Sequence, residues 1–429
     1  TANVSPLPSS ASPAVDVDGG GLNAEQQGAL DSVVACPSGG YVLIQGLPGT
    51  GKTSTIVQIV LALARTAQQP HGSSSGAGSS SSSSTLGART VLITSHTHSA
   101  VDNLCIKLHQ AGFTGFLRVG EGTRIDQQVP QCNRLDVAEE AGHLNSVGRY
   151  ASYVESFSVV LATCLTASRH PLFGGLRARR AAAAAAAGSA EANAPASSCS
   201  GVGTAFDYCI LDEASQVTQP TSLGALMLAD RMVLVGDHCQ LQPVVRSPLA
   251  ARSGMRESWF ERLCLAHPVS VKRLCRQYRM CRQINAVTSS LVYGNRMVCG
   301  SPAVAQARLQ LDRAALQAVV KKATADASTV DPSAANWLVS ALQPACPFLF
   351  LNTSNLPAPE SQQTAGFSGK GRYNSTEVRL VMLLVQGLVL SGVQPSKIGI
   401  VSPYKAHLKA LQAGLDHLKA KYHRASTTG

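Results

Sequence analysis

The sequence predicts an α/β protein whose parallel sheet is covered by helices on both faces, with one complete domain followed by an incomplete second one. Short apolar runs typical of strands alternate along the chain with longer runs typical of helices. A glycine-rich loop between the first strand and its helix has the composition of a phosphate site. An acidic pair follows directly on a later strand, at the edge where parallel sheets bind their ligands.

The loop is the most specific signal in the chain. It matches the phosphate-binding pattern G-x-x-x-x-G-K-[ST] at every fixed position, as Gly46-Leu47-Pro48-Gly49-Thr50-Gly51-Lys52-Thr53. A strand-type run precedes it and a helix-type run follows, so backbone N–H groups and the helix dipole would both face an anion. Lys52 would reach the β- and γ-phosphates, and the Thr53 hydroxyl would bind Mg²⁺. An ordinary glycine-rich turn before a helix would not require these eight residues.

The first domain is expected to span residues 22–266, after a disordered leader at 1–21. Asn23 is expected to cap a short first helix. Further strands are expected at 91–95, 158–163, 208–211 and 232–235, and a helix at 100–110 with Val101, Leu104, Cys105 and Leu108 on one face. Two low-complexity inserts interrupt this pattern. One is a Ser/Gly-rich surface loop at about 69–88, and the other, at about 177–204, is Ala-rich and forms a solvated helix stub or stays disordered.

The second domain is expected to span residues 267–429. The alternation of strands and helices starts again there, with strands at 269–274, 348–351 and 398–401 and helices at 280–291, 376–390 and 406–418. The chain stops after the last of these helices. We therefore expect this second α/β domain to be incomplete.

The composition bounds the class of protein. The 429 residues, 45% of them hydrophobic, suffice for two or three domains. Lys and Arg (36) outnumber Asp and Glu (25), and the net charge of +11 favours an anionic polymer as a partner. No apolar run is long enough to span a bilayer, and the N-terminal residues lack a signal-peptide pattern. The 12 cysteines form no C-x-x-C pair, which indicates thiols of a reducing compartment and argues against a metal–sulfur site.

The acidic pair Asp212-Glu213 comes directly after the expected strand at 208–211. An acidic residue at the carboxyl end of a parallel strand, near a phosphate loop, can hold Mg²⁺ from the side opposite Thr53. Glu213 can orient or deprotonate an attacking water. An isolated Asp-Glu pair is more often a solvated turn, but its position after a buried-type strand favours the catalytic interpretation.

Two further side chains could act on the γ-phosphate. Gln240 follows the strand at 232–235 and could contact the phosphate or the water, or its segment could simply cap the strand. Arg279 follows the strand at 269–274 and could neutralise charge on the transferred phosphoryl group from a neighbouring domain. Since other basic residues surround it, Arg279 could equally belong to a basic surface that contacts nucleic acid.

A polar segment after the strand at 91–95 is a candidate nucleic-acid contact. Its residues His96, His98, Ser99 and Asn103 could contact a sugar–phosphate backbone or a base. Ser99 could also cap the following helix, and the two roles are compatible. The histidines are weak candidates for a metal site because no third ligand lies nearby in the sequence.

Together these stretches resemble a superfamily 1 helicase of the branch that includes the nonsense-mediated-decay helicases. Within it, they are most similar to the helicase part of the eukaryotic replication nuclease-helicases. The wording Thr-His-Ser-Ala-Val-Asp-Asn and Asp-Glu-Ala-Ser-Gln favours this group over its RNA-acting relatives. The segments that carry the resemblance, over about residues 22–420, are 46–53, 94–103, 116–120, 212–216, 234–238, 277–280, 298–301 and 398–404.

The resemblance implies a P-loop NTPase with two RecA-like parallel-sheet domains, the second truncated, that close on ATP and Mg²⁺. It implies that Gln26 reads adenine, that Tyr278 stacks on the adenine ring and that Glu377 contacts the sugar. It makes Arg279 an arginine finger. The family moves 5′→3′ on single-stranded DNA.

The sequence departs from the family at several points. Cys239 and Gln242 replace residues that are usually Gln and Pro, while Gln240 is kept. The later motifs, one of which carries a second arginine finger, do not appear. Nor do the nuclease carboxylates, the iron–sulfur cysteines or the β-barrel that precedes the motor. The chain therefore resembles a fragment of a longer protein, and we expect no iron–sulfur cluster within it.

The function expected from these observations is an ATP-dependent 5′–3′ DNA helicase motor that acts in replication and repair. Single-stranded DNA is the expected partner, with replication or repair proteins as further candidates and no membrane. The nucleus is the expected location, and the cytoplasm or an organelle is the alternative.

Two other functions stay open. The first is an RNA helicase of the same branch. The second is a protein that binds ATP and nucleic acid without productive hydrolysis. For the parent protein, non-productive binding is disfavoured because the expected catalytic residues are intact, namely Asp212, Glu213, Gln240 and Arg279. The missing second finger argues for it in the isolated chain, which we expect to bind ATP but to show little stimulated turnover.

Overall fold

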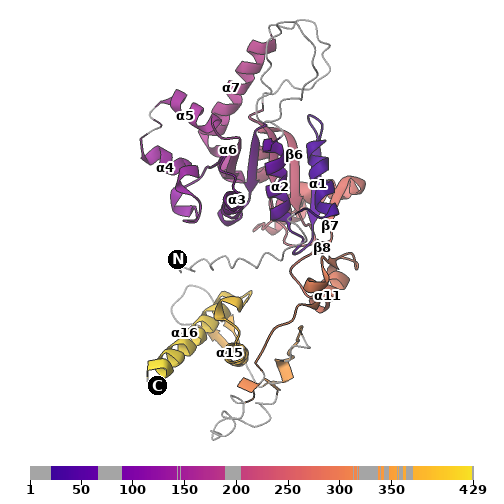
Figure 1. The fold of residues 1–429 in the computed structure, drawn as a ribbon, viewed down its shortest axis with the longest axis vertical. Coiled ribbons are helices and arrows are strands. Elements are labelled where there is room, and N and C mark those ends of the chain that lie inside the picture. The colour runs from indigo at the N-terminus through magenta and orange to yellow at the C-terminus, as the bar shows by residue number, and fades with distance from the viewer. Residues whose placement is uncertain are drawn as a thin grey trace. The chain divides into compact units, whose positions relative to one another are not determined.

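The computed structural model divides into two compact units (Figure 1). The N-terminal unit comprises Gly20–Arg279 and Thr288–Gly300, and the C-terminal unit includes Met280–Val287 and Ser301–Gly429. Residues 1–20 of the leader and the Ser/Gly insert lie outside the described residues, as does most of the Ala-rich insert. The described residues are 21–65, 89–142, 144, 146–188, 204–312, 314–315, 317, 337–338, 340–342, 347–354, 356, 361–363 and 371–427.

The N-terminal unit is built on a seven-stranded sheet with the order β3-β4-β2-β5-β6-β1-β7. All of its pairings are parallel, and this confirms the fold class predicted for the first domain. The strands are β1 (Tyr41–Gly46), β2 (Val91–Ser95), β3 (Phe116–Arg118), β4 (Val159–Thr163), β5 (Phe206–Leu211), β6 (Ala229–Gly236) and β7 (Val271–Leu274).

Helices cover both faces of this sheet (Figure 1). Successive strand residues point to opposite faces, so Ile44 packs in the core with Ile56 of α2, whereas Leu43 packs in the other core with Phe260 of α10. Burial on both faces is why the strands appear in the sequence as continuous apolar runs. One face carries α1 (Ala24–Val34), α2 (Lys52–Arg65) and α3 (His98–Gln110), and the other carries α6 (Cys164–Arg169), α8 (Gln219–Leu226) and α10 (Trp259–Ala266).

Several local predictions are confirmed. Asn23 caps α1 in a capping box, and the Gln26 side chain accepts the reciprocal hydrogen bond from the Asn23 backbone N–H. The apolar face predicted for the second long helix is buried in α3. The start of the Ala-rich insert is helical, since it forms the end of α7 (Pro171–Gly188). The remaining helices of this region are α4 (Leu135–Glu140), α5 (Val147–Glu155) and α9 (Pro248–Ala250).

The strand expected to open the second domain instead completes the first sheet. β7 pairs in parallel with β1, from Leu43 opposite Val271 to Gly46 opposite Leu274. Val271 and Leu274 are buried, whereas the two basic residues between them are exposed, as is common on an edge strand. The sequence predicted the strand but could not show which sheet it joins. The chain continues through β8 (Arg276–Gln277), α11 (Arg282–Val292) and β9 (Val298–Cys299), and β8 pairs in parallel with β9.

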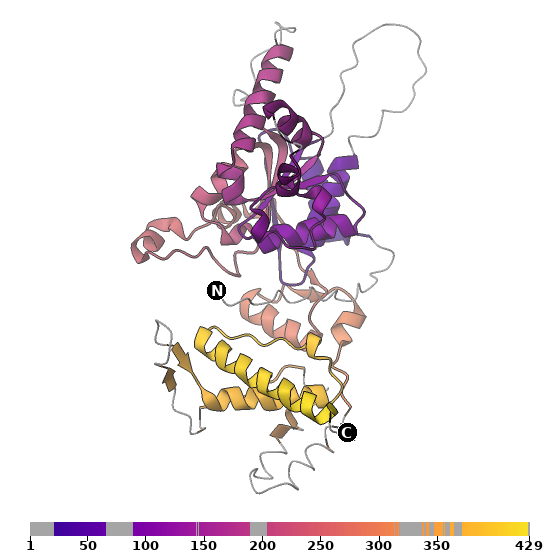
Figure 2. The ribbon, with the colours of Figure 1, turned by 90° about the vertical axis from the view of Figure 1, so that its left-hand side faces the viewer.

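The C-terminal unit contains two long helices, α15 (Ser375–Leu390) and α16 (Lys405–Thr427), which pack side by side (Figure 2). The helices approach closely where Gly414 faces Met382, because a Cβ at Gly414 would lie 2.9 Å from the Met382 sulfur. The unit also includes α12 (Pro302–Gln306) and an antiparallel pair of strands, β10 (Ser361–Gln363) and β11 (Gly371–Tyr373).

The strands expected at 348–351 and 398–401 are not formed, and that prediction is wrong. Phe350 is 79% exposed and Val401 is 95% exposed. A strand of a parallel sheet is stable only when neighbours satisfy its backbone and cover its side chains. Within the described residues, neither run forms a strand of a sheet. Separately, none of the described helices combines the length and the apolar composition that crossing a membrane requires.

Candidate nucleotide-binding site

The candidate site lies where neighbouring parallel strands end. The loop follows β1, Asp212 follows β5 and Asp237 follows β6, and these three strands are adjacent in the sheet. Leu211 pairs with Leu234, and Gln45 pairs with Gly236, so the three ends are in register. The fold thus gathers at one edge the polar residues that the sequence placed after separate strands.

The loop has the backbone shape that a bound phosphate requires. Gly49 and Gly51 both have left-handed φ values, +75° and +80°. Lys52 folds back over the loop, so that its Nζ donates to the Gly46 carbonyl at 3.1 Å and a Cβ at Gly46 would overlap its side chain. Thr50 Oγ1 donates to the Leu47 carbonyl at 2.7 Å. The N-terminus of the 14-residue α2 follows directly, so its free N–H groups face the same space.

The first helix is tied to the loop through Gln26. The Gln26 side chain is 8% exposed, and its Nε2 donates to the Thr50 carbonyl at 3.1 Å. Its Oε1 accepts from the Asn23 backbone N–H at 3.1 Å. The amide expected to read adenine is therefore already paired in this structure, where it supports the loop. Its contact with adenine stays a prediction.

Tyr278 and Arg279 lie beside the loop within the N-terminal unit. The Tyr278 N–H donates to the Gly49 carbonyl at 2.8 Å, and its hydroxyl accepts from Asn23 Nδ2 at 3.0 Å. Arg279 is exposed, and its N–H donates to Gln277 Oε1 at 2.8 Å. We expected a neighbouring domain to contribute this arginine, but Arg279 belongs to the same unit as the loop, and a Cβ on Gly49 would lie 2.7 Å from its Cβ. The finger role itself stays a prediction.

Asp212 and Glu213 have different environments. Asp212 is 5% exposed and accepts the Glu213 N–H at 2.9 Å. Burial, and secondly the charge of Glu213, raises the pKa of Asp212 to about 6, although Lys52 and Lys107 act in the opposite direction. Glu213 has a φ of 51°, a left-handed conformation that is rare outside glycine and occurs at functional sites. The described residues contain no group of three or more His, Cys, Asp or Glu side chains that could hold a metal ion.

The raised pKa predicts a pH-dependent metal site. Mg²⁺ needs the ionised carboxylate, and a carboxyl with a pKa of about 6 is largely protonated one unit lower. We expect the Mg²⁺ affinity of the nucleotide complex to fall about tenfold from about pH 8 to about pH 5. Titrations of Mg²⁺ with wild type and Asp212→Asn separate this effect from the nucleotide's own protonation. An equal pH dependence in both proteins would contradict it.

Asp237 is the centre of a buried network. It is 1% exposed, and its Oδ2 accepts from Gln240 Nε2 and from the Tyr293 hydroxyl, each at 2.8 Å. Its Oδ1 accepts from the Cys239 N–H at 3.1 Å. Gln240, expected to sense the γ-phosphate, is held here by Asp237, and its contact with phosphate stays a prediction. No role for Tyr293 was predicted, since its only signal was an aromatic residue at the end of an expected helix.

Removing the Tyr293 hydroxyl should weaken this network. Burial and the hydrogen bond to Asp237 raise the pKa of Tyr293, so its hydroxyl remains a donor. Because Tyr293→Phe leaves a buried carboxylate with one donor fewer, we expect the free energy of unfolding to fall by about 1–3 kcal/mol. Urea unfolding measures this change. Tyr404→Phe is the matched control, since Tyr404 is 59% exposed, and equal effects of the two substitutions would refute the prediction.

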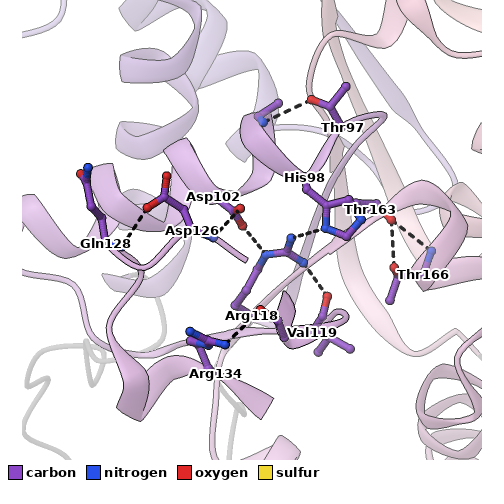
Figure 3. A network of polar contacts seen from close by, with 12 residues as sticks. Thr97, His98, Asp102, Arg118, Val119, Asp126, Gln128, Arg134, Thr163 and Thr166 are labelled. Carbon is purple, nitrogen blue, oxygen red and sulfur yellow. Dashed lines mark hydrogen bonds and ion pairs between the residues drawn. The ribbon is translucent and has the colours of Figure 1, made fainter. Parts of the chain in front are cut away.

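The candidate nucleic-acid residues lie at the end of β2. Ser99 and Asn103 are exposed on the first turns of α3, and Thr97 rather than Ser99 caps the helix. His98 is half-buried, and its Nδ1 lies 3.2 Å from Nη2 of the buried Arg118 (Figure 3). The sequence assigned no role to Arg118, although a lone charge within an apolar strand was a visible signal.

Glu377 belongs to the C-terminal unit, near the start of α15. The Asn374 side chain caps that helix by accepting the N–H groups of Thr376 and Glu377. The Thr353 hydroxyl donates to Glu377 Oε1 at 3.4 Å. The contact of Glu377 with the nucleotide sugar stays a prediction.

A parallel sheet with this loop after β1 and a buried aspartate after a neighbouring strand defines a P-loop nucleotide-binding protein. Two sequence families, each described as an AAA domain, match the chain, one over residues 21–143 and 189–248 and the other over 255–427.

Curated relatives specify the family further. The chain is 34% identical over 400 residues to the DNA replication ATP-dependent helicase/nuclease DNA2 of Xenopus laevis and 34% identical over 391 residues to that of Homo sapiens. It is 31% identical over 392 residues to the enzyme of Saccharomyces cerevisiae. These alignments cover 93%, 91% and 91% of this chain. The chain belongs to the superfamily 1 helicases, in the group of the DNA replication ATP-dependent helicase/nucleases.

The chain spans about a third or less of the length of these relatives, at 32%, 31% and 21%. Among solved structures, a complex of arterivirus nonstructural protein 10, a helicase, with DNA aligns over 64% of this chain and 44% of its own. Its TM-score is 0.31 at 15% identity, so the family assignment depends on the sequence comparisons.

Proposed function

We propose that this chain is the ATP-dependent motor of a DNA helicase, which couples ATP hydrolysis to 5′→3′ movement on single-stranded DNA. The observation that carries the proposal is the gathering of the loop, Asp212 and Asp237 at three adjacent strand ends of one sheet. Phosphoryl transfer needs this combination of an anion cradle and carboxylates, since its catalysis is mostly positioning and charge stabilisation.

The chain's own residues fit MgATP. The left-handed Gly49 and Gly51 leave room for phosphate oxygens against the backbone N–H groups. Lys52 would bind the β- and γ-phosphates, and Thr53 with Asp212 would hold Mg²⁺, which neutralises developing charge when bound. Glu213 would orient and deprotonate the attacking water. The adenosine would contact Gln26, Tyr278 and Glu377, and the γ-phosphate would contact Gln240 and Arg279. Pro48 and Thr50 of the loop would also contact the nucleotide.

DNA is proposed as the nucleic acid, bound by His98, Ser99 and Asn103. Support comes from the exposure of Ser99 and Asn103 at the end of β2, from the net charge of +11 and from relatives named for DNA replication. The same names support work in DNA replication. Work in repair, location in the nucleus and partnership with other replication or repair proteins are proposed from the family resemblance. The polarity of movement is taken from the family resemblance. RNA is the alternative nucleic acid.

The test compares matched DNA and RNA single strands at one fixed salt concentration, because backbone binding depends steeply on salt. Tighter binding of DNA, together with MgATP binding that requires Lys52, supports the proposal. Tighter binding of RNA would overturn the choice of DNA, and failure to bind MgATP would overturn the motor. ATP hydrolysis is followed in the same samples with Glu213→Gln as the inactive reference. Binding of both ligands without stimulated hydrolysis would favour an ATP-binding protein without productive turnover.

A further inference from the structure

A buried arginine links the core to the candidate nucleic-acid face. Arg118 in β3 is 0% exposed, and its Nε donates to Asp102 Oδ1 at 2.7 Å. Its Nη1 donates to the Val119 carbonyl at 2.6 Å, and its Nη2 lies 3.2 Å from Nδ1 of His98. Asp102 Oδ2 accepts the Asp126 N–H at 3.0 Å. Figure 3 shows the guanidinium between Asp102 and His98.

This geometry fixes the chemical form of His98. A guanidinium only donates hydrogen bonds and stays charged, so the facing Nδ1 of His98 must accept. The single proton of the neutral ring is therefore on Nε2, at the opposite edge of the ring. A second proton would have to go on Nδ1, directly against the arginine. Hence His98 is held as a neutral donor through Nε2.

The surrounding charges support the neutral form. Four groups act on His98: Arg118 and Asp102 within the network, and Arg124 and Glu121 from the segment after β3. Burial is the first cause that lowers the pKa of His98, and the charge of Arg118 is the second. The two carboxylates act in the opposite direction but do not reverse the shift.

The network satisfies a buried cation and also reaches beyond the core. A buried ion pair is often no more stabilising than apolar side chains of the same volume. Asp102 accepts from Nε and a backbone carbonyl accepts from Nη1, while the partner described for the buried Nη2 is His98. That contact leads out of the core to the first residue of α3, beside the exposed Ser99.

We propose that Arg118 is a positioning residue that orients His98 and holds its Nε2–H as a neutral donor to the phosphate or base of the bound strand. The inference rests on the proposed nucleic-acid function for its ligand, whereas the state of His98 does not depend on any ligand. The contact of His98 with the strand would accordingly keep its strength when the pH falls to about 6, unlike that of a free histidine.

The first experiment needs no nucleic acid. Protein labelled with ¹⁵N-histidine is titrated by NMR, and the His98 signals are assigned by their loss in His98→Gln. We expect Nε2 protonated and Nδ1 unprotonated down to about pH 6. Doubly protonated His98 near pH 6.5, or a proton on Nδ1, would overturn the proposal even if the protein proved to bind no DNA.

The second experiment is a double-mutant cycle on DNA affinity. Arg118→Met with Asp102→Asn removes the network without leaving an unpaired buried charge. We expect a loss of about 3- to 10-fold when His98 is present and under about 2-fold in the His98→Ala background. Equal losses in both backgrounds would show that Arg118 does not act through His98. Circular dichroism melting confirms that each variant is folded.

The pH profile of the same variants separates positioning from simple support of the fold. The ratio of wild-type to His98→Ala affinity should stay constant from about pH 7.5 to about pH 6, because His98 stays neutral. In the Arg118→Met, Asp102→Asn background, DNA affinity is likewise compared with and without His98→Ala. There the ratio should rise at about pH 6, since a free histidine becomes a cation that attracts phosphate. A wild-type ratio that rises as the pH falls would refute the proposal.

Discussion

Replacing Lys52 with alanine is expected to weaken MgATP binding about 10- to 150-fold and to leave AMP binding unchanged. The ammonium group would make a charge-assisted contact with the β- and γ-phosphates, a contact worth about 1.5–3 kcal/mol. AMP lacks both phosphates, so it serves as the internal control ligand. Isothermal titration calorimetry with MgATP and AMP measures both affinities.

The fold should tolerate this change. Lys52 is half-exposed, and the one hydrogen bond described for its side chain is that to the Gly46 carbonyl. Lys397→Ala, at an exposed lysine of the C-terminal unit, is the matched control and should leave both affinities unchanged. An unchanged MgATP affinity in Lys52→Ala would mean that the loop does not bind the terminal phosphates.

Replacing Gly49 with alanine is expected to lower MgATP affinity about tenfold or more, and also to destabilise the fold. The φ of +75° is unfavourable for any L side chain, and the new Cβ would lie 2.7 Å from the Cβ of Arg279. The Tyr278 N–H holds the Gly49 carbonyl at 2.8 Å, so the loop cannot move away without breaking that bond. A displaced loop would lose hydrogen bonds to phosphate oxygens.

Gly39 offers a matched control for backbone strain. Its φ of +71° is nearly the same, but a Cβ there would meet nothing within 4 Å. Gly39→Ala should therefore show the strain alone, about 1–2 kcal/mol of stability, with MgATP affinity within about twofold of wild type. Urea unfolding and calorimetry on both variants separate the two effects. Similar affinities in Gly39→Ala and Gly49→Ala would argue against a phosphate cradle at Gly49.

Much of the N-terminal unit could be predicted from the sequence. Strands buried on both faces appear as apolar runs, and this located β1, β2, β4, β5 and β6. The loop pattern then placed the anion site after β1, and the parallel arrangement placed Asp212 at the same edge.

Predictions that depended on distant partners failed or were never made. The edge strand β7 was assigned to the second domain, because a run of residues does not show which neighbour it pairs with. The run at 348–351 had the composition of a strand but does not form a strand of any sheet in the described chain. Tyr293 and Asp237 are 56 positions apart, so nothing in the local sequence links them.

By itself, the sequence determined the phosphate loop, the acidic pair and the alternation of strands and helices, since each depends on residues that are close together along the chain. The tertiary structure alone decided that Tyr278 and Arg279 lie beside the loop, and that Arg118 lies against His98. Contacts of this kind depend on which strands become neighbours in the sheet. That choice depends on packing across the whole unit, so it cannot be read from any single stretch of sequence.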